Sequence, residues 1–222
     1  MRTLSERLST IEALIPKGVR AADIGTDHGH LPISLIKSGK SSRVIACDIR
    51  EKPLDNAREN IKKTATEGIE LRLGDGLSPV LPHEVDCIVI AGMGGEVISG
   101  ILEAAEWVKS PEYTLLLQPM TSADALRRYL SENLFEIKSE TAVLDGGKLY
   151  TVIETGYSGK EQPTGEVFYR IGRLDSTDPT ARRYIEKQIK IVKKCAADLS
   201  LAKKPEESAR YSALLEEMEK QI

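Results

Sequence analysis

Twelve residues near the N-terminus decide the expected fold: Ala21-Ala22-Asp23-Ile24-Gly25-Thr26-Asp27-His28-Gly29-His30-Leu31-Pro32. They connect an apolar run typical of a strand, 19–24, to an apolar run with helical spacing, 31–38. A loop that leads from a strand into a helix is where a doubly wound sheet binds a nucleotide-like ligand. Gly25 and Gly29 suit such a loop, because glycine allows a sharp turn and close approach of a ligand to the backbone.

The chain around this stretch alternates short apolar runs with longer amphipathic runs. Strands are expected at 42–47, 69–73, 87–91 and 114–118, and helices at 53–65, 96–107 and 123–131. An earlier helix is expected because Leu4, Leu8, Ile11 and Ile15 fall at helical spacing. The alternation predicts an α/β fold, with a doubly wound and mostly parallel sheet that is covered by helices on both faces.

The end of the sheet is expected to differ from the rest. Two strand-like runs, 135–144 and 149–155, are separated only by Asp145-Gly146-Gly147-Lys148. Such a link is too short for a crossover between parallel strands, which needs a dozen or more residues. Asp-Gly-Gly is instead suited to the turn of a hairpin. The sheet should therefore end in an antiparallel hairpin strand.

The composition changes after Gly156, and this change divides the chain into 1–156 and 157–222. Residues 157–165 are rich in Ser, Gly, Lys and Pro and are typical of a linker. Beyond them two apolar stripes at helical spacing, separated by Lys203-Lys204-Pro205, predict a coiled-coil-like α-helical hairpin; the stripes are Ile185, Ile189, Val192, Ala196, Leu199 and then Tyr211, Leu214, Met218. Because the linker has no apolar pattern, 1–156 is expected to fold without 157–222.

Composition excludes several classes of protein. The chain has 222 residues, 41% hydrophobic and 29% charged, which is ordinary for a globular protein and argues against disorder. Its formal net charge of −3 is not that of a uniformly basic nucleic-acid binder. Three cysteines without C-x-x-C spacing favour neither a disulfide framework nor a zinc site. No apolar run is long enough for a membrane span or signal peptide, so a cytoplasmic protein is expected.

Acidic and glycine residues follow the ends of three successive expected strands. Asp23, Gly25, Asp27 and Gly29 surround the first end, Asp48 ends the second strand, and Asp75-Gly76 follows the third. A carboxylate about 20 residues beyond such a loop can accept both hydroxyl protons of a ribose. Asp75 is expected to reach an exocyclic adenine amine. These residues predict a site for an adenosine-containing cofactor.

The charge of the first loop favours S-adenosylmethionine over a dinucleotide. Asp23 and Asp27 would repel a pyrophosphate, whereas they would attract a sulfonium and an ammonium group. The expected terminal hairpin agrees, because class I methyltransferase sheets end in this way. His28, His30 and His83 are the three histidines, and no cluster of further metal ligands accompanies them, so no metal is expected.

These motifs resemble those of the bacterial tRNA (adenine(22)-N(1))-methyltransferase family over nearly the whole chain. The resemblance lies in Leu4-Ser5-Glu6-Arg7-Leu8, Asp23-Ile24-Gly25-Thr26-Asp27-His28-Gly29-His30-Leu31-Pro32, Ile90-Ala91-Gly92-Met93-Gly94-Gly95, Leu117-Gln118-Pro119-Met120 and Lys148-Leu149-Tyr150. It implies a Rossmann-type S-adenosylmethionine-dependent methyltransferase with a helical C-terminal domain, acting on N1 of adenosine 22 in tRNA. The family often has Asn where this chain has Met120, so position 120 is given no polar role.

The segment after the fourth expected strand agrees with methylation of a ring nitrogen. Ala91-Gly92-Met93-Gly94-Gly95 offers no carbonyl or carboxylate side chain that would orient an exocyclic amine. Adenine N1 has an in-plane lone pair and needs no base, so catalysis is mostly positioning. We expect Ala91, Gly92 and Met93 at the cofactor and Gly94 and Gly95 at the substrate. Asp27 is expected to stabilise the developing positive charge and His28 to contact the base, as the catalytic residues.

The C-terminal part carries a basic helix that suits tRNA. Residues 182–204 contain 8 basic and 2 acidic residues. Such a stripe is typical of contact with a phosphate backbone. Its expected tRNA contacts are Arg182, Arg183, Lys187, Lys190, Lys193 and Lys194. Arg7, and also Arg2 and Arg20, are expected near the mouth of the site.

Three other interpretations of the protein's function remain open. One is a small-molecule methyltransferase whose helical hairpin dimerises, which the basic helix disfavours. Another is a dinucleotide-dependent oxidoreductase, which Asp27 and the terminal hairpin disfavour. The third is a module that binds the cofactor as a sensor without turnover. No obligate protein partner is implied.

Overall fold

The computed structural model describes residues 4–222, and its centre is a seven-stranded sheet of order β3-β2-β1-β4-β5-β7-β6. The first five strands in this order are parallel, β7 is antiparallel to β5, and β6 is antiparallel to β7. The strands are β1 (Ala21–Ile24), β2 (Val44–Asp48), β3 (Ile69–Leu73), β4 (Cys87–Gly94), β5 (Thr114–Thr121), β6 (Phe135–Asp145) and β7 (Lys148–Tyr157). The predicted parallel sheet with a terminal antiparallel hairpin is therefore confirmed.

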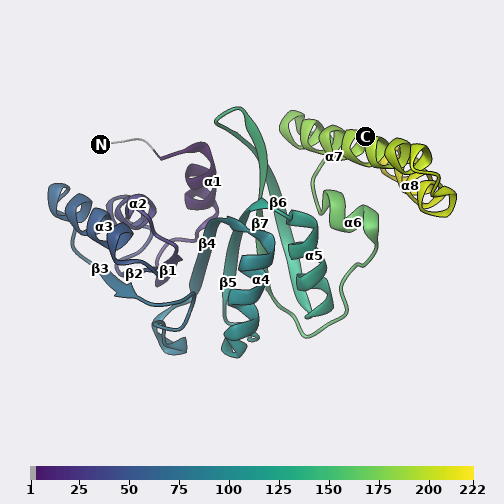
Figure 1. Ribbon diagram of the computed structural model, residues 1–222. Helices are drawn as coiled ribbons and strands as arrows, with labels where there is room; N and C mark the ends of the chain where they lie inside the picture. The colour runs from purple at the N-terminus through teal and green to yellow at the C-terminus, as the bar shows by residue number, and fades with distance from the viewer. Residues whose placement is uncertain (1–3) are drawn as a thin grey trace.

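Helices cover both faces of the sheet (Figure 1). One face packs against α1 (Glu6–Leu14), α2 (His30–Lys37) and α3 (Glu51–Lys63), and the other against α4 (Gly95–Ala104) and α5 (Ala123–Glu132). Short 3₁₀ turns lie at Pro82–Glu84 and Glu106–Val108. Strand side chains alternate between the two cores: Ile88 and Ile90 pack on the α4 side, Cys87 and Val89 on the α1 side. Burial on both faces explains why these strands are continuous apolar runs.

Strand β4 is longer than the sequence predicts. The strands expected at 87–91 and 114–118 are both extended: β4 continues to Gly94, and β5 beside it continues to Thr121. The pairing register shifts between Ala91 and Met93 and again before Gly94. Gly92 has φ +80°, a conformation that favours glycine. Gly92 therefore lies in the irregular end of β4, and Gly95 begins α4.

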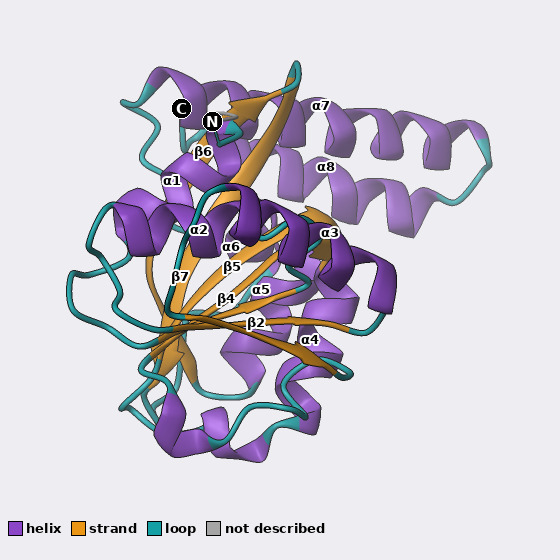
Figure 2. Cartoon of the chain, turned by 90° about the vertical axis from the view of Figure 1, so that its left-hand side faces the viewer, coloured by secondary structure: helices purple, strands orange, loops and turns teal. Residues whose placement is uncertain are grey.

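The C-terminal part forms α6 (Glu166–Ile171), α7 (Pro179–Leu201) and α8 (Pro205–Glu219). Asp178 caps α7, because its carboxylate accepts hydrogen bonds from Thr180 N at 2.9 Å and Ala181 N at 2.8 Å. The apolar stripes of α7 and α8 meet in a cluster with Ile189, Val192 and Met218. Figure 2 shows the two helices side by side, so the predicted helical hairpin is confirmed. Helix α6, only six residues long, was not predicted.

The C-terminal part packs against the sheet more closely than the sequence suggests. Arg127 of α5 is fully buried and pairs with Glu140 of β6 at 2.9 Å. Its Nη1 donates to the carbonyl oxygens of Tyr169 at 2.8 Å and Arg170 at 3.1 Å, and its guanidinium lies 5.8 Å from the Tyr184 ring centroid. A chain ending at Tyr157 would expose this ion pair to solvent. The expectation that 1–156 folds unaided stays a prediction, although the helices beyond the polar linker complete a buried contact with Arg127.

Candidate cofactor and substrate site

A cavity of about 290 Å³ opens at the carboxyl ends of the parallel strands. The loop after β1, the end of β4, α1 and β5 contribute its walls. It brings together many of the predicted site residues with several others; the lining residues are Arg7, Leu8, Asp23, Gly25, Thr26, Asp27, His28, His30, Leu31, Ala91, Gly92 and Met120. The position agrees with the rule that ligands of α/β sheets bind beyond the strand ends, beside the point where strand order reverses.

The loop after β1 is held against the neighbouring strand by its backbone. The amides of Gly25 and Thr26 donate to the carbonyl oxygen of Cys47 at 2.8 and 2.9 Å. Gly25 has φ +83°, and a Cβ at this position would lie 2.3 Å from Cε of Met93. Glycine therefore meets two requirements here, a left-handed backbone and room for the Met93 side chain below the cavity.

Asp23 is the buried acid of this cavity. Its side chain is only 6% exposed, and burial raises its pKa to about 6, with Asp48 raising it further and the Thr26 side chain opposing the rise. At neutral pH the carboxylate is mostly ionised, without a cationic side chain bonded to it among residues 4–222. A buried and uncompensated negative charge favours a cationic ligand.

Asp48 ends β2 beside this loop but does not line the cavity itself. Its side chain is 7% exposed, and Oδ1 accepts a hydrogen bond from Arg50 N at 2.9 Å. Within residues 4–222, Oδ2 accepts no hydrogen bond. One carboxylate oxygen is therefore available to a ligand hydroxyl.

Asp75 and Gly76 lie farther from the cavity than the sequence suggests. They line a separate groove beside Val97 and Ile101 of α4, where Gly76 packs against Ile101. The reason is topological, because β3 is the edge strand and lies two strands away from β1. The adenine contact expected of Asp75 stays a prediction.

Asp27 and His28 lie at the open rim of the cavity. Asp27 Oδ2 is 3.4 Å from His28 Nε2, and both side chains are exposed. The His28 and His30 rings stack with centroids 5.4 Å apart. Their positions suit contact with an incoming base, and the catalytic roles assigned to Asp27 and His28 stay predictions.

Gln118 is a site residue to which the sequence analysis gave no role. It is fully buried at the end of β5, and its Oε1 accepts hydrogen bonds from Gly92 N at 3.2 Å and Arg7 Nη1 at 2.6 Å. Its Nε2 donates to the Pro119 carbonyl at 2.9 Å. The sequence feature that could have indicated Gln118 is its position as a polar residue directly after the apolar run Leu115-Leu116-Leu117.

Arg7 joins the cavity wall to the terminal hairpin. Its Nε lies 2.7 Å from Asp145 Oδ2, and its guanidinium is 5.2 Å from the ring centroid of Tyr150. Met120 also touches this group, since its Sδ lies 3.2 Å from Arg7 Nη1. Arg7 is thus at the site as predicted, but its hydrogen bonds are directed to protein groups.

The two glycines assigned to the substrate differ in their surroundings. Gly95 is buried, and a Cβ there would lie 2.1 Å from the carbonyl oxygen of Ser122, so close packing of α4 on the next loop requires glycine. Gly94 is half-buried, and a Cβ there would lie 3.3 Å from Thr121 Oγ1. Packing explains Gly95, whereas a Cβ on Gly92 would come no closer than 4.0 Å to Arg7 Nη1, so Gly92 presents bare backbone to the cavity.

The basic residues fall into three groups. Arg182, Arg183, Lys187, Lys190, Lys193 and Lys194 are exposed on α7, as expected. Arg20 is not near the cavity mouth: it precedes β1, at the amino edge of the sheet, where it pairs with Asp86. That prediction is wrong because a residue before a strand lies at the opposite edge from one after it. Arg2 lies outside the described residues.

Residues 4–222 also show no metal cluster and no membrane-spanning helix. No three His, Cys, Asp or Glu side chains lie together in a way that would hold a metal ion. No helix in this part of the chain combines the length and apolar character needed to cross a bilayer.

Comparison with known proteins agrees with this geometry. A family model for the methyltransferase domain matches residues 4–153. The chain is 37% identical over 151 residues to the tRNA (adenine(22)-N(1))-methyltransferase of Bacillus subtilis, covering 68% of this chain and 63% of that protein. This alignment thus spans less than two thirds of the B. subtilis protein.

Solved structures extend the match to both parts of the chain. The B. subtilis m1A22 tRNA methyltransferase TrmK has a TM-score of 0.85 and 28% identity, over 97% of this chain and 98% of that one. Mycoplasma capricolum TrmK, solved with S-adenosyl-homocysteine, has a TM-score of 0.82 and 26% identity over 100% of both chains. The chain therefore belongs to the methyltransferase family, and the resemblance to the bacterial tRNA (adenine(22)-N(1))-methyltransferases is confirmed.

Proposed function

We propose that the protein transfers a methyl group from S-adenosylmethionine to N1 of adenosine 22 in tRNA. The observation that carries this proposal is the cavity at the switch point of the sheet, which the buried Asp23 carboxylate lines together with the backbone of Ala91 and Gly92. A buried negative charge suits a cationic methyl donor, and an open backbone suits a planar base. The full-length structural likeness to m1A22 methyltransferases supports the same assignment.

The residues present fit S-adenosylmethionine. Asp48 has a free carboxylate oxygen for the ribose diol, and Asp23 and Asp27 supply negative charge for the ammonium and sulfonium groups. Gly92 leaves space beside its backbone that a side chain would occupy, and Gly25 provides the left-handed turn of the loop. When bound, S-adenosylmethionine supplies an electrophilic methyl group.

The chain's own contribution to the reaction is mainly positioning. Adenine N1 already has a lone pair in the ring plane, so no side chain has to remove a proton before attack. The backbone at Ala91 and Gly92, where Gly92 N donates to Gln118 Oε1, provides an open place for a planar base. The product base is cationic, and the Asp27 carboxylate at the rim stabilises the positive charge that develops.

Helix α7 binds tRNA electrostatically through its exposed lysines. Lys190, Lys193 and Lys194 are exposed and form no ion pair within residues 4–222, so their charges are available to phosphates. We accordingly assign methyl transfer to 1–156 and tRNA binding mainly to 157–222. A tRNA substrate supports a location in the cytoplasm.

The experiment is methyl transfer from labelled S-adenosylmethionine to bulk tRNA, followed by digestion and identification of the nucleoside. We expect 1-methyladenosine as the labelled product. A label that appears only in small molecules from a cell extract would support the small-molecule methyltransferase and contradict the proposal. Binding of S-adenosylmethionine without transfer to either would support a sensor.

A further inference from the structure

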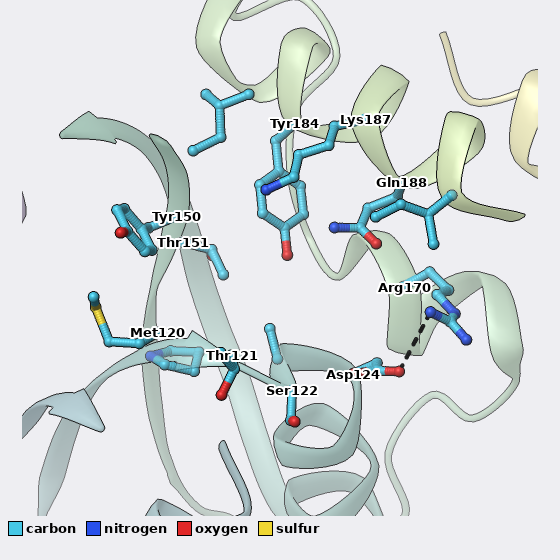
Figure 3. Close-up of a pocket in the computed structure, with 14 residues that line it drawn as sticks. Met120, Thr121, Ser122, Asp124, Tyr150, Thr151, Arg170, Tyr184, Lys187 and Gln188 are labelled. Carbon is cyan, nitrogen blue, oxygen red and sulfur yellow. Dashed lines mark ion pairs between the residues drawn. The ribbon is translucent and has the colours of Figure 1, made fainter. Parts of the chain in front are cut away.

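A second cavity, of about 240 Å³, lies between the sheet and the helical hairpin. The loop from β5 to α5 and the start of β7 form one side, and α7 forms the other with Tyr184, Lys187 and Gln188 (Figure 3). Met120 lines both this cavity and the cofactor cavity, so the two are neighbours with a shared wall. The basic helix therefore reaches the catalytic region as well as the outer surface.

The charge of this second cavity is positive. Asp124 is its acidic residue, and its Oδ2 lies 3.5 Å from Nη1 of Arg170, which offsets its charge. Lys187 is exposed and forms no ion pair among residues 4–222. The amino end of α5, which begins at Ala123, adds its positive end to the same space.

Tyr184 is the buried member of the polar groups from α7. Tyr184 is 4% exposed, and its ring lies over the guanidinium of Arg127, which is itself paired with Glu140. Figure 3 shows the Tyr184 hydroxyl, the Gln188 amide and the Lys187 amine directed towards the space between α7 and the sheet. One ammonium with a hydroxyl and an amide is a donor set that suits a phosphate and a sugar hydroxyl.

We propose that this second cavity binds the ribose-phosphate of one nucleotide adjoining the target adenosine, with its phosphate at Lys187 and its ribose at Tyr184 and Gln188. The inference rests on the proposed function. An enzyme that modifies a base within folded RNA has to take that base out of its stack, which brings the adjoining backbone against the protein. The cavity adjoins the cofactor site through Met120 and has room for one ribose-phosphate rather than a base pair.

The proposal distinguishes two kinds of lysine on one helix. Lys193 is exposed on α7 but does not line the cavity, so it should contribute only general attraction to the backbone. Lys187 should hold one particular phosphate and thereby place the base. Replacing Lys187 should therefore slow methyl transfer even when tRNA is saturating, whereas replacing Lys193 should weaken tRNA binding alone.

The test compares full-length Lys187→Met with Lys37→Met, a control for loss of one exposed charge in the last turn of α2, away from both cavities. Single-turnover methyl transfer is measured with saturating tRNA and S-adenosylmethionine, alongside the tRNA Kd. We expect Lys187→Met to slow transfer about tenfold, as for a lost charge-assisted contact, and Lys37→Met to leave the rate within about twofold. Lys187→Arg should recover most of the rate. Equal rates for Lys187→Met and Lys37→Met would overturn the proposal.

A second arm identifies the phosphate. Synthetic tRNAs carry one neutral methylphosphonate at either phosphate that flanks the target adenosine. We expect one of these substitutions to slow the wild-type enzyme about tenfold and to have no further effect on Lys187→Met. If each methylphosphonate slows Lys187→Met by the same factor as the wild type, Lys187 contacts neither phosphate. The proposed function would still stand in that case. Failure of the wild-type protein to methylate any tRNA would instead overturn the proposed function and this inference with it.

Discussion

Nη1 of Arg7 donates a hydrogen bond to Oε1 of Gln118 at 2.6 Å, and this contact joins α1 to the end of β5 above the cofactor cavity. The same Gln118 oxygen accepts from Gly92 N, so one buried amide links the first helix to the backbone on which the target base is expected to lie. Since Arg7 also pairs with Asp145, helix α1, the cavity and the terminal hairpin are connected through two side chains.

Replacing Arg7 with Met should loosen this arrangement. The change removes the hydrogen bond to Gln118 and the ion pair with Asp145, leaving a buried acceptor with one partner fewer. We expect a loss of about 1–3 kcal/mol in the free energy of unfolding and weaker binding of S-adenosylmethionine. Chemical denaturation and calorimetry measure these. Arg20→Met is the control, because it removes an exposed ion pair at the opposite edge and should leave cofactor binding unchanged. Equal effects of the two variants on cofactor affinity would contradict the role of Arg7.

Asp23 should make the stability of the ligand-free protein depend on pH. Its pKa is raised from 3.8 to about 6 by burial, so the folded state holds the proton more tightly than the unfolded state. The stabilising contribution of this proton is present below pH 3.8 and is lost as pH rises through 6; its full size is about 3 kcal/mol at most. Asp23→Asn should remove this dependence and be more stable than the wild type at a pH of about 7.5 in denaturation experiments.

The same substitution should weaken cofactor binding, because an asparagine side chain lacks the charge that attracts a cationic ligand. Asp23→Asn therefore changes stability and cofactor affinity in opposite directions at neutral pH. A variant less stable than the wild type in the ligand-free state would show that the Asp23 carboxylate is not destabilised by burial.

Asp48→Ala should weaken S-adenosylmethionine binding by about 1–3 kcal/mol, the size of a lost charge-assisted hydrogen bond. Isothermal calorimetry measures the change. Asp75→Ala is the comparison, since Asp75 is exposed and does not line the cofactor cavity. An unchanged affinity in Asp48→Ala would remove Asp48 from the ribose site. A loss in Asp75→Ala as large as in Asp48→Ala would support the adenine contact predicted for Asp75.

Truncation after Tyr157 should destabilise the remaining protein. It removes Tyr169, Arg170 and Tyr184, which cover the buried pair of Arg127 and Glu140. We expect a cost of about 3–5 kcal/mol, as when a buried ion pair loses partners. Arg127→Met with Glu140→Gln in the truncated chain should recover part of it, because no charge is then left without its partners. The midpoints of thermal unfolding of the full-length and truncated proteins measure this cost. Identical midpoints for the full-length and truncated proteins would contradict this prediction and support independent folding of 1–156.

Local patterns in the sequence predict the sheet, its terminal hairpin and the helical hairpin because each depends on neighbouring residues. Asp23 and Gly25 were found because a strand, a turn and a helix in succession place them at the switch point. Gln118 was missed because its importance depends on Arg7 and Gly92, which are distant in sequence. Arg127 was missed for the same reason: it looks like an ordinary helix-surface charge until Glu140 and the carbonyls of α6 surround it.

The most direct test of the proposed function is the position of the modified base in one tRNA. A transcript with adenosine at position 22 and a second with guanosine there are incubated with the full-length protein and S-adenosylmethionine, then copied by reverse transcriptase. Methylation at N1 blocks Watson–Crick pairing. We therefore expect reverse transcriptase to stop at adenosine 22 in the first transcript and not to stop there in the second. Full-length copies of both transcripts, or a stop elsewhere that persists in the guanosine transcript, would contradict this expectation.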